Sequence, residues 1–344
     1  MQSPNCPVSA HCCTVAPTTK GARQSAWPDG IRDALALASA AAFAIIFLVA
    51  PASAQGRDLE HALGERVEFL PSGGDDPVDL QVTIFQPAGY GPFPVVVINH
   101  GLDIGDPRRQ ARNRPLAAAR QFVERGYAVI APMLRGFAGS GGTLAEHGCN
   151  TRANGEAAQQ DLNAVVRWLK LKSWADTSRM VMTGQSYGGL NTMAYSQNPV
   201  PGFKLFVNFA GGVKYAIGCE WELRLQEAFE SYGKLSRMPS MWFYGQNDSY
   251  FPPRIIAPAF EAFKASGGNG ELVAYGAFKT DAHAMFANHD GVGIWLDTVL
   301  LKMKQQGLPV DIEQPDDEVK WAAGVQDEAQ MTSVFAGWVD PLNQ

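Results

Sequence analysis

The sequence predicts an α/β fold with a mostly parallel central sheet and helices on both of its faces. Short apolar runs typical of buried strands alternate along the chain with segments in which apolar residues recur at helical spacing. Such alternation favours a parallel sheet between two helical layers. One of the strands also leads through a glycine-rich turn directly into a helix, and the chain of 344 residues is long enough for one large domain of this class.

The N-terminal part is expected to lie outside this domain. An apolar run over 34–50 is followed by Pro51 and an A-x-A site, which is typical of a secretory signal peptide cleaved before Gln55. An uncleaved membrane anchor is the alternative, because the run approaches the length of a span, but Pro51 favours cleavage. We therefore expect an extension with a signal peptide over 1–54 and a single domain over 55–344. The mature protein is expected to be secreted or periplasmic, without stable membrane insertion.

Eight segments are expected to be strands. The first two alternate apolar and polar residues, as half-exposed antiparallel edge strands do, whereas the third is continuously apolar, like a strand covered on both faces. The expected strands cover residues 66–70, 80–85, 94–99, 128–132, 179–183, 205–209, 241–244 and 272–275.

Helices are expected between these strands. Pro115 opens one of them and Gly126 closes it, which is the usual asymmetry of helix ends. Stripes of apolar residues at helical spacing predict two further helices over 156–172 and 292–303. A short helix over 190–195 is expected after the fifth strand.

Two segments depart from the alternation of strands and helices. Residues 212–237 are rich in aromatic and charged side chains and are expected to form a small lid. Residues 309–344 form a C-terminal tail whose role the sequence does not indicate.

Composition excludes some classes of function. The chain has a net charge of −6 at pH 7, and no basic run interleaved with aromatic residues predicts nucleic-acid binding. After the expected signal peptide only Cys149 and Cys219 remain, and in an exported chain such a pair predicts one disulfide, with two free thiols as the alternative. Cys149 with the nearby His147 makes only two ligands, so no metal site is expected.

Residues 184–188 read Gly-Gln-Ser-Tyr-Gly and match the pattern G-x-S-x-G. A short buried strand precedes this pentapeptide and a helix follows it, which is the setting of a nucleophile elbow. In such an elbow the strained backbone and the small flanking residues expose the serine hydroxyl at the top of the sheet. Ser186 is therefore the expected nucleophile.

A serine hydroxyl needs a base within hydrogen-bond reach and an acid that orients this base. The chain order expected after an elbow is serine, then Asp or Glu, then His. Asp248 follows the apolar strand 241–244, and His283 follows the last strand and precedes the last helix. Both lie where catalytic groups collect in open α/β sheets, so we expect Asp248 to be the acid and His283 the base.

Other acids and bases near these positions are weaker candidates. Asp281 is only two residues from His283, and side chains so close on one loop rarely face each other. Asp103 lies on a different loop, after the third strand. His289 beside Asp290 fits a helix entry better than a base.

An oxyanion needs hydrogen-bond donors as well. In an elbow one donor is the backbone N–H that follows the nucleophile, here Tyr187, and the other comes from the loop after the third strand. In that loop Gly101 allows close approach of the backbone, and the N–H of Leu102 is the expected second donor. His100 is expected to pack the loop rather than to act in catalysis.

Taken together, these motifs resemble the α/β-hydrolase superfamily, and within it the group of dienelactone hydrolases and prolyl-oligopeptidase-like esterases. The motifs are His100-Gly101, Arg125-Gly126-Tyr127, Arg135-Gly136-Phe137, Gly139-Ser140-Gly141-Gly142, the run 184–189, Asp248 and His283. Dienelactone hydrolases use cysteine at the elbow, so serine argues against dienelactone as the substrate. Prolyl oligopeptidases carry a propeller domain, which the region 55–80 is too short to hold.

The resemblance implies a secreted serine hydrolase that cleaves small-molecule carboxylic esters through an acyl-enzyme and needs no cofactor. An exopeptidase or amidase with the same triad is one alternative, and the residue types do not separate it from an esterase. A non-catalytic binding protein on a hydrolase fold is the other alternative, but the intact order of serine, aspartate and histidine argues against it. The sequence does not indicate the oligomeric state.

Overall fold

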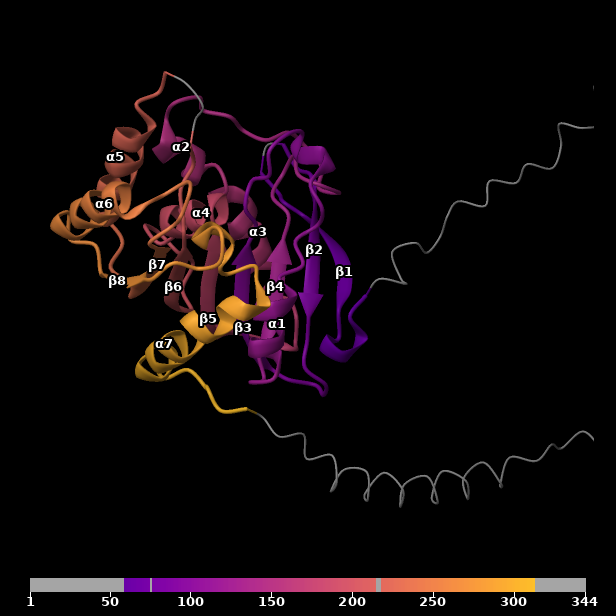
Figure 1. Cartoon of the computed structure of the whole chain (residues 1–344). Helices are drawn as coiled ribbons and strands as arrows, with labels where there is room; N and C mark the ends of the chain where they lie inside the picture. Colours follow the sequence, from indigo (N-terminus) through magenta and orange to yellow (C-terminus); the bar gives the residue numbers. More distant parts are fainter. Residues whose placement is uncertain (1–58, 75, 215–217, 313–344) are drawn as a thin grey trace, which may run out of the picture. The chain divides into compact units, whose positions relative to one another are not determined.

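The structure of the protein is a computed structural model that describes residues 59–74, 76–214 and 218–312. These residues form an eight-stranded sheet in the order β1-β2-β4-β3-β5-β6-β7-β8 (Figure 1). The strands are β1 (Arg66–Pro71), β2 (Asp79–Phe85), β3 (Phe93–Asn99), β4 (Ala128–Pro132), β5 (Ala175–Gln185), β6 (Phe203–Phe209), β7 (Ser240–Gly245) and β8 (Gly270–Tyr275). Each strand that the sequence predicts is present.

The sheet is antiparallel only at its first edge. β2 pairs antiparallel with both β1 and β4, and the pairs from β4 through β3, β5, β6 and β7 to β8 are parallel. Because parallel strands end at the same edge of a sheet, the loops that follow β3, β5, β7 and β8 gather there. On these loops or at their borders lie the expected triad and oxyanion residues, Leu102, Ser186, Tyr187, Asp248 and His283.

Alternate side chains of the central strands enter two separate cores. On β3, Val95 and Val97 belong to one core, whereas Val96 and Ile98 belong to the other. This period of two is the one expected for a strand that is covered on both faces.

Two helices cover one face of the sheet, as Figure 1 shows. α1 (Leu116–Val123) contributes Phe122, and α7 (Val292–Gln305) contributes Trp295. The two rings lie with their centroids 5.9 Å apart, and that of Trp295 lies 5.7 Å from the ring of Phe209 on β6.

The other helices pack on the opposite face. They are α2 (Thr151–Glu156), α3 (Gln159–Leu169), α4 (Tyr187–Tyr195), α5 (Trp221–Gly233) and α6 (Pro253–Ala265). The fully buried Trp242 of β7 lies at the centre of this layer, with its ring centroid 4.6 Å from Phe229 of α5 and 4.8 Å from Phe263 of α6. A central indole of this size anchors both helices to the sheet.

Two expectations need correction. The helix expected over 156–172 is α3, which is shorter, and a separate helix, α2, precedes it and begins where the Asn150 side chain accepts a hydrogen bond from the amide of Ala153. Most of the lid expected over 212–237 is α5, which buries Leu225, Phe229 and Tyr232 and is therefore part of the helical layer.

The ends of the chain lie outside the described residues. This holds for the expected signal peptide over 1–54 and for residues 313–344 of the expected tail. None of the helices in the described part has both the length and the apolar character needed to cross a membrane.

Candidate active site

Ser186 lies at the turn between β5 and α4, with φ +57° and ψ −124°. A positive φ is uncommon for a residue with a side chain, and such a conformation costs about 1–3 kcal/mol. The surrounding backbone holds it in place, because the amide of Ser186 donates to the carbonyl of Phe209 and its carbonyl accepts from the amide of Gly212, both at 3.0 Å. The turn therefore has the strained geometry of a nucleophile elbow.

The glycines of the elbow are required by close backbone approach. A Cβ at Gly188 would lie 2.3 Å from the carbonyl oxygen of Asn99 and 2.6 Å from that of His100. A Cβ at Gly184 would lie 2.4 Å from the backbone of Gly188. The elbow is thus packed directly against the end of β3, which brings the loop that begins at Gly101 beside Ser186.

Asp248 lies in the loop after β7 and is buried, with 2% of its surface exposed. Its Oδ1 accepts hydrogen bonds from the amides of Tyr250 at 2.9 Å and Phe251 at 2.8 Å. Its Oδ2 lies 3.2 Å from Nδ1 of His283. A buried carboxylate is expected to have partners for its lone pairs, and these three contacts supply them.

His283 lies in the 3-10 turn Ala282–Ala284, which follows β8 in the chain. Its ring has centroid distances of 4.5 Å to Tyr250 and 5.5 Å to Phe251. The carbonyl of His283 accepts a hydrogen bond from the side-chain amide of Gln185, the residue before Ser186. The structure thus pairs His283 with Asp248 and joins the His283 turn to the elbow.

The weaker candidates have other partners. The carboxylate of Asp281 accepts from the amide of His283 at 2.9 Å, so it contacts the backbone of that residue and not its ring. His289 is exposed and lies 3.8 Å from Asp290. Asp103, on the loop after β3, lines a cavity that Ser186 also lines.

His100 is a packing residue, as the sequence predicts. Its Nε2 accepts from the amide of Leu134 at 3.1 Å, so Nδ1 bears the proton and donates to the carbonyl of Gly101 at 2.7 Å. Burial disfavours the charged ring and lowers the pKa of His100 to about 4. Because both ring nitrogens of His100 bond to backbone groups, this side chain fixes the conformation of the loop after β3.

A cavity of about 310 Å³ opens beside Ser186. Its wall includes Leu102 and Tyr187, the residues expected to supply oxyanion donors. Apolar side chains form much of the rest, from Ile104, Leu144, Val213, Tyr250 and Phe251.

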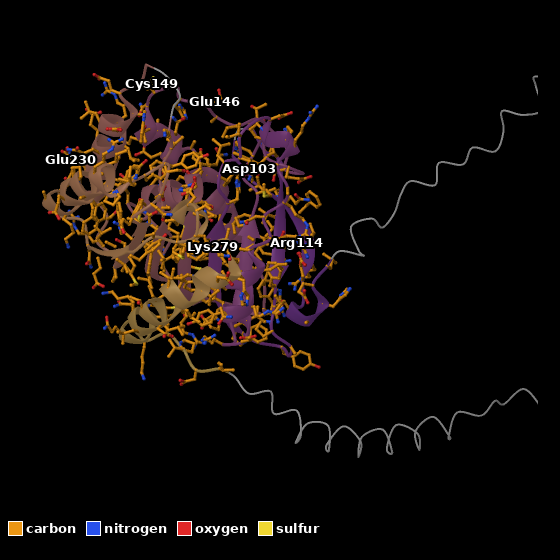
Figure 2. All side chains as sticks on the ribbon, viewed as in Figure 1. Asp103, Arg114, Glu146, Cys149, Glu230 and Lys279 are labelled. Atoms are coloured by element: carbon orange, nitrogen blue, oxygen red, sulfur yellow. A yellow bond between two sulfur atoms is a disulfide. The ribbon has the colours of Figure 1, made fainter. Side chains whose placement is uncertain are left out.

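Charged side chains also line this cavity. Asp103 and Glu146, both exposed, come from different loops, and Figure 2 shows them toward the same end of the domain. Lys214 lies with its ammonium 5.5 Å from the ring of Trp221 and 5.7 Å from that of Tyr250. The sequence does not predict that these three charged residues share one cavity, because their positions in different loops give no local pattern.

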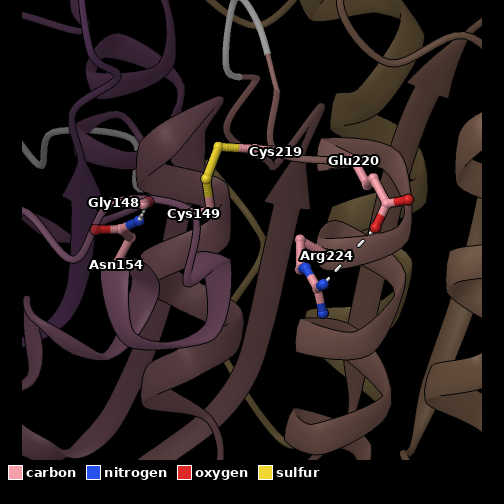
Figure 3. The surroundings of a disulfide bond; sticks show 6 residues. All are labelled: Gly148, Cys149, Asn154, Cys219, Glu220 and Arg224. Atoms are coloured by element: carbon pink, nitrogen blue, oxygen red, sulfur yellow. Dashed lines mark hydrogen bonds and ion pairs between the residues drawn. A yellow bond between two sulfur atoms is a disulfide. The ribbon is translucent and has the colours of Figure 1, made fainter. Parts of the chain in front are cut away.

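Cys149 and Cys219 form a disulfide, with 5.3 Å between their Cα atoms (Figure 3). The pairing predicted from the sequence is therefore present. Since Cys149 is bonded to another cysteine, it is not available as a metal ligand. Among the residues described by the structure, no cluster of three or more His, Cys, Asp or Glu side chains could hold a metal ion.

The loop between β3 and α1 is tied to the edge of the sheet by a buried carboxylate. Glu65, with 4% of its surface exposed, accepts hydrogen bonds from Arg112 and Arg114, each at 2.6 Å. Burial alone would raise the pKa of Glu65, but hydrogen bonds from Arg114, the amide of Glu60 and Arg112 outweigh it and lower the pKa from 4.5 to about 2.

This carboxylate predicts an acid-dependent stability. Because the pKa of Glu65 is lower in the folded than in the unfolded protein, its ionised carboxylate stabilises the fold above pH 4.5. This contribution to the free energy of unfolding disappears as the pH falls toward 2. Glu65→Gln should lower the free energy of unfolding by about 3 kcal/mol at pH 7 and flatten its decline between pH 4.5 and 2. Urea titrations over this range measure both effects. Glu261 on α6 is exposed, so Glu261→Gln is the control. An equal loss of unfolding free energy in that variant would contradict the role of Glu65.

Comparison with solved structures identifies the fold as that of the α/β-hydrolases. The esterase Pf2001 from Pyrococcus furiosus is 19% identical, with a TM-score of 0.51 over 71% of this chain and 94% of the esterase. A puromycin-hydrolyzing peptidase from Mycobacterium tuberculosis is also 19% identical, with a TM-score of 0.51 over 72% of this chain but only 40% of the peptidase. The chain thus spans less than half the length of that peptidase.

Residues 74–229, which are somewhat less than half of the chain, match the family described as X-Pro dipeptidyl-peptidase (S15 family). No curated protein matches the sequence. The chain therefore has the α/β-hydrolase fold, which it shares with an esterase and a peptidase, and its residues 74–229 are similar to the X-Pro dipeptidyl-peptidase family.

Proposed function

We propose that this protein is a secreted carboxylic-ester hydrolase in which Ser186, His283 and Asp248 form the catalytic triad. The observation that supports this most directly is the 3.2 Å contact between His283 and Asp248. The turn that contains His283 also bonds to Gln185 in the elbow of Ser186. The three residues come from three separate loops at one edge of the sheet. A pairing of this kind between distant segments is what the triad chemistry needs.

The contact between Asp248 and His283 supports one set of proton positions. A carboxylate that accepts from Nδ1–H of His283 leaves Nε2 without a proton, so that Nε2 can accept the proton of the Ser186 hydroxyl. Ser186 Oγ attacks the ester carbonyl, and the protonated imidazole then gives its proton to the leaving alcohol. A water molecule then attacks the carbonyl of the acyl-enzyme, and His283 takes its proton and passes this proton to Ser186 Oγ as the acid leaves.

The amides of Tyr187 and Leu102 are proposed to stabilise the oxyanion. Tyr187 is the first residue of α4, and Leu102 comes two residues after His100, whose carbonyl oxygen lies against Gly188. Both residues line the same cavity as Ser186. Donors fixed in the backbone need no reorganisation when charge develops on the carbonyl oxygen.

The fold matches both an esterase and a peptidase, each with a TM-score of 0.51. The match to the Pyrococcus esterase covers 94% of that protein, whereas the match to the Mycobacterium peptidase covers 40% of it. An X-Pro peptidase is the second candidate function, because the family match over 74–229 favours it. The same triad would serve both reactions, which differ in how much protonation the leaving group needs.

The disulfide supports export. Disulfides persist in oxidising compartments and are rare in the cytosol, so the Cys149–Cys219 bond fits a secreted or periplasmic protein.

A substrate panel tests the proposal. Purified protein is given p-nitrophenyl esters of increasing acyl length and the p-nitroanilides of single amino acids and of X-Pro dipeptides, and a fluorophosphonate probe reports the activated serine. We expect ester hydrolysis and labelling, both absent in Ser186→Ala. A Ser186→Ala variant that hydrolyses esters like the parent would overturn the proposal, and higher kcat/KM on the X-Pro anilides would establish the peptidase instead. Absence of both activity and labelling would leave a non-catalytic binding protein.

A further inference from the structure

The backbone of His283 is held at both of its polar groups by side chains outside the triad. Its N–H donates to Asp281 Oδ1 at 2.9 Å, and its C=O accepts from the amide of Gln185. The preceding carbonyl, of Ala282, accepts from the hydroxyl of Tyr275 at 3.0 Å. A 3-10 turn of three residues has few hydrogen bonds of its own, so these contacts decide where the imidazole lies.

Asp281 joins the His283 turn to the loop of Asp248. Its Oδ1 accepts from the amide of Ser249 at 3.1 Å, and its Oδ2 accepts from the Ser249 hydroxyl at 2.5 Å. Ser249 is the residue directly after Asp248. One carboxylate therefore sets the spacing between the acid loop and the base turn.

Gln185 joins the same turn to the elbow. It is the last residue of β5 and directly precedes Ser186, and its side chain is half-buried. Together with Asp281 it connects the His283 turn to the segments that bear the other two triad residues.

A structural role and a positioning role predict effects of different size on folding and on turnover. A single hydrogen bond contributes about 1 kcal/mol to stability, which is small for a domain of this size. Displacement of a catalytic group by 1 Å, in contrast, costs about 10²-fold in rate. The effect of losing these bonds should therefore be far larger on turnover than on folding.

We infer that Gln185 and Asp281 are positioning residues, which hold His283 between Ser186 and Asp248 by binding its backbone C=O and N–H. This inference rests on the proposed function, since it assigns His283 as the base. Neither residue contacts the imidazole nitrogens or the reacting atoms, so neither is a catalytic residue.

Paired substitutions test the inference. Gln185→Met keeps the length of the side chain and removes the donor, and Asp281→Ala removes the carboxylate. We expect kcat on a p-nitrophenyl ester to fall about 10- to 100-fold in each variant, with KM within about twofold of the parent. The rate of inactivation by a fluorophosphonate should fall by the same factor, because the same base activates Ser186. Asp281→Asn, which keeps one acceptor oxygen, should recover part of the loss.

The matched control is Gln160→Met. Gln160 is exposed on α3 and does not line the cavity beside Ser186, and its side-chain amide donates to the carbonyl of Gly73 at 3.0 Å. This variant loses the same kind of hydrogen bond and should keep the parent kcat. Equal kcat in Gln185→Met, Gln160→Met and the parent would overturn the positioning role. Failure of the proposed function has a different signature, since the parent itself would then show no Ser186-dependent hydrolysis.

Discussion

Asp248→Asn should lower kcat by about 10⁴-fold with little change in KM. The reason lies in the two amides that fix one oxygen of this side chain. Oδ1 accepts from the N–H groups of Tyr250 and Phe251, and an asparagine would keep its oxygen in that position. Its NH₂ group would then point at Nδ1 of His283 and donate to it. The proton of the ring would move to Nε2, which could no longer accept the proton of Ser186.

Steady-state hydrolysis of p-nitrophenyl esters measures this loss, and thermal unfolding tests that the variant is folded. Asp290→Asn is the matched control, because Asp290 is an exposed carboxylate that pairs with Lys279 on the surface. A decrease of less than tenfold in Asp248→Asn, in a folded protein, would contradict the proposed role of Asp248.

The strands and the elbow could be predicted because their signals are local. A strand buried on both faces, such as β3, shows as an unbroken apolar run, and the structure bears out the positions of such runs. The elbow adds steric demands that only glycine meets at positions 184 and 188. The order of the candidate residues after the elbow then follows from the topology of a parallel sheet, whose strand ends meet at one edge.

Other features depend on contacts that no local pattern reveals. α5 has mixed aromatic and charged residues, and only its packing against Trp242 shows that it belongs to the helical layer. α6 contains Pro258 in its interior, which in a sequence indicates the end of a helix. The sequence also presents Asp281 only as a rival of Asp248, whereas in the structure it bonds to the backbone of Ser249 and His283.

The disulfide joins two loops whose neighbouring residues line the cavity beside Ser186. Leu144 and Glu146 precede Cys149, and Lys214 precedes Cys219. Residues 149 and 219 are 70 positions apart, so the bond closes a long loop and restricts the unfolded chain. A bond placed this way is expected both to stabilise the fold and to limit the width of the cavity mouth.

The double variant Cys149→Ser, Cys219→Ser should therefore lose about 2–4 kcal/mol of unfolding free energy. For a domain of this size, such a loss corresponds to a decrease in Tm of roughly 5–15 °C. KM for short esters should rise while kcat changes less, because the triad loops after β7 and β8 are held by their own hydrogen bonds. Calorimetry and steady-state kinetics measure the two effects. Reduction of the parent with dithiothreitol should reproduce both and leave the double variant unchanged, and a parent that is indifferent to reduction would show that the bond braces neither the fold nor the cavity.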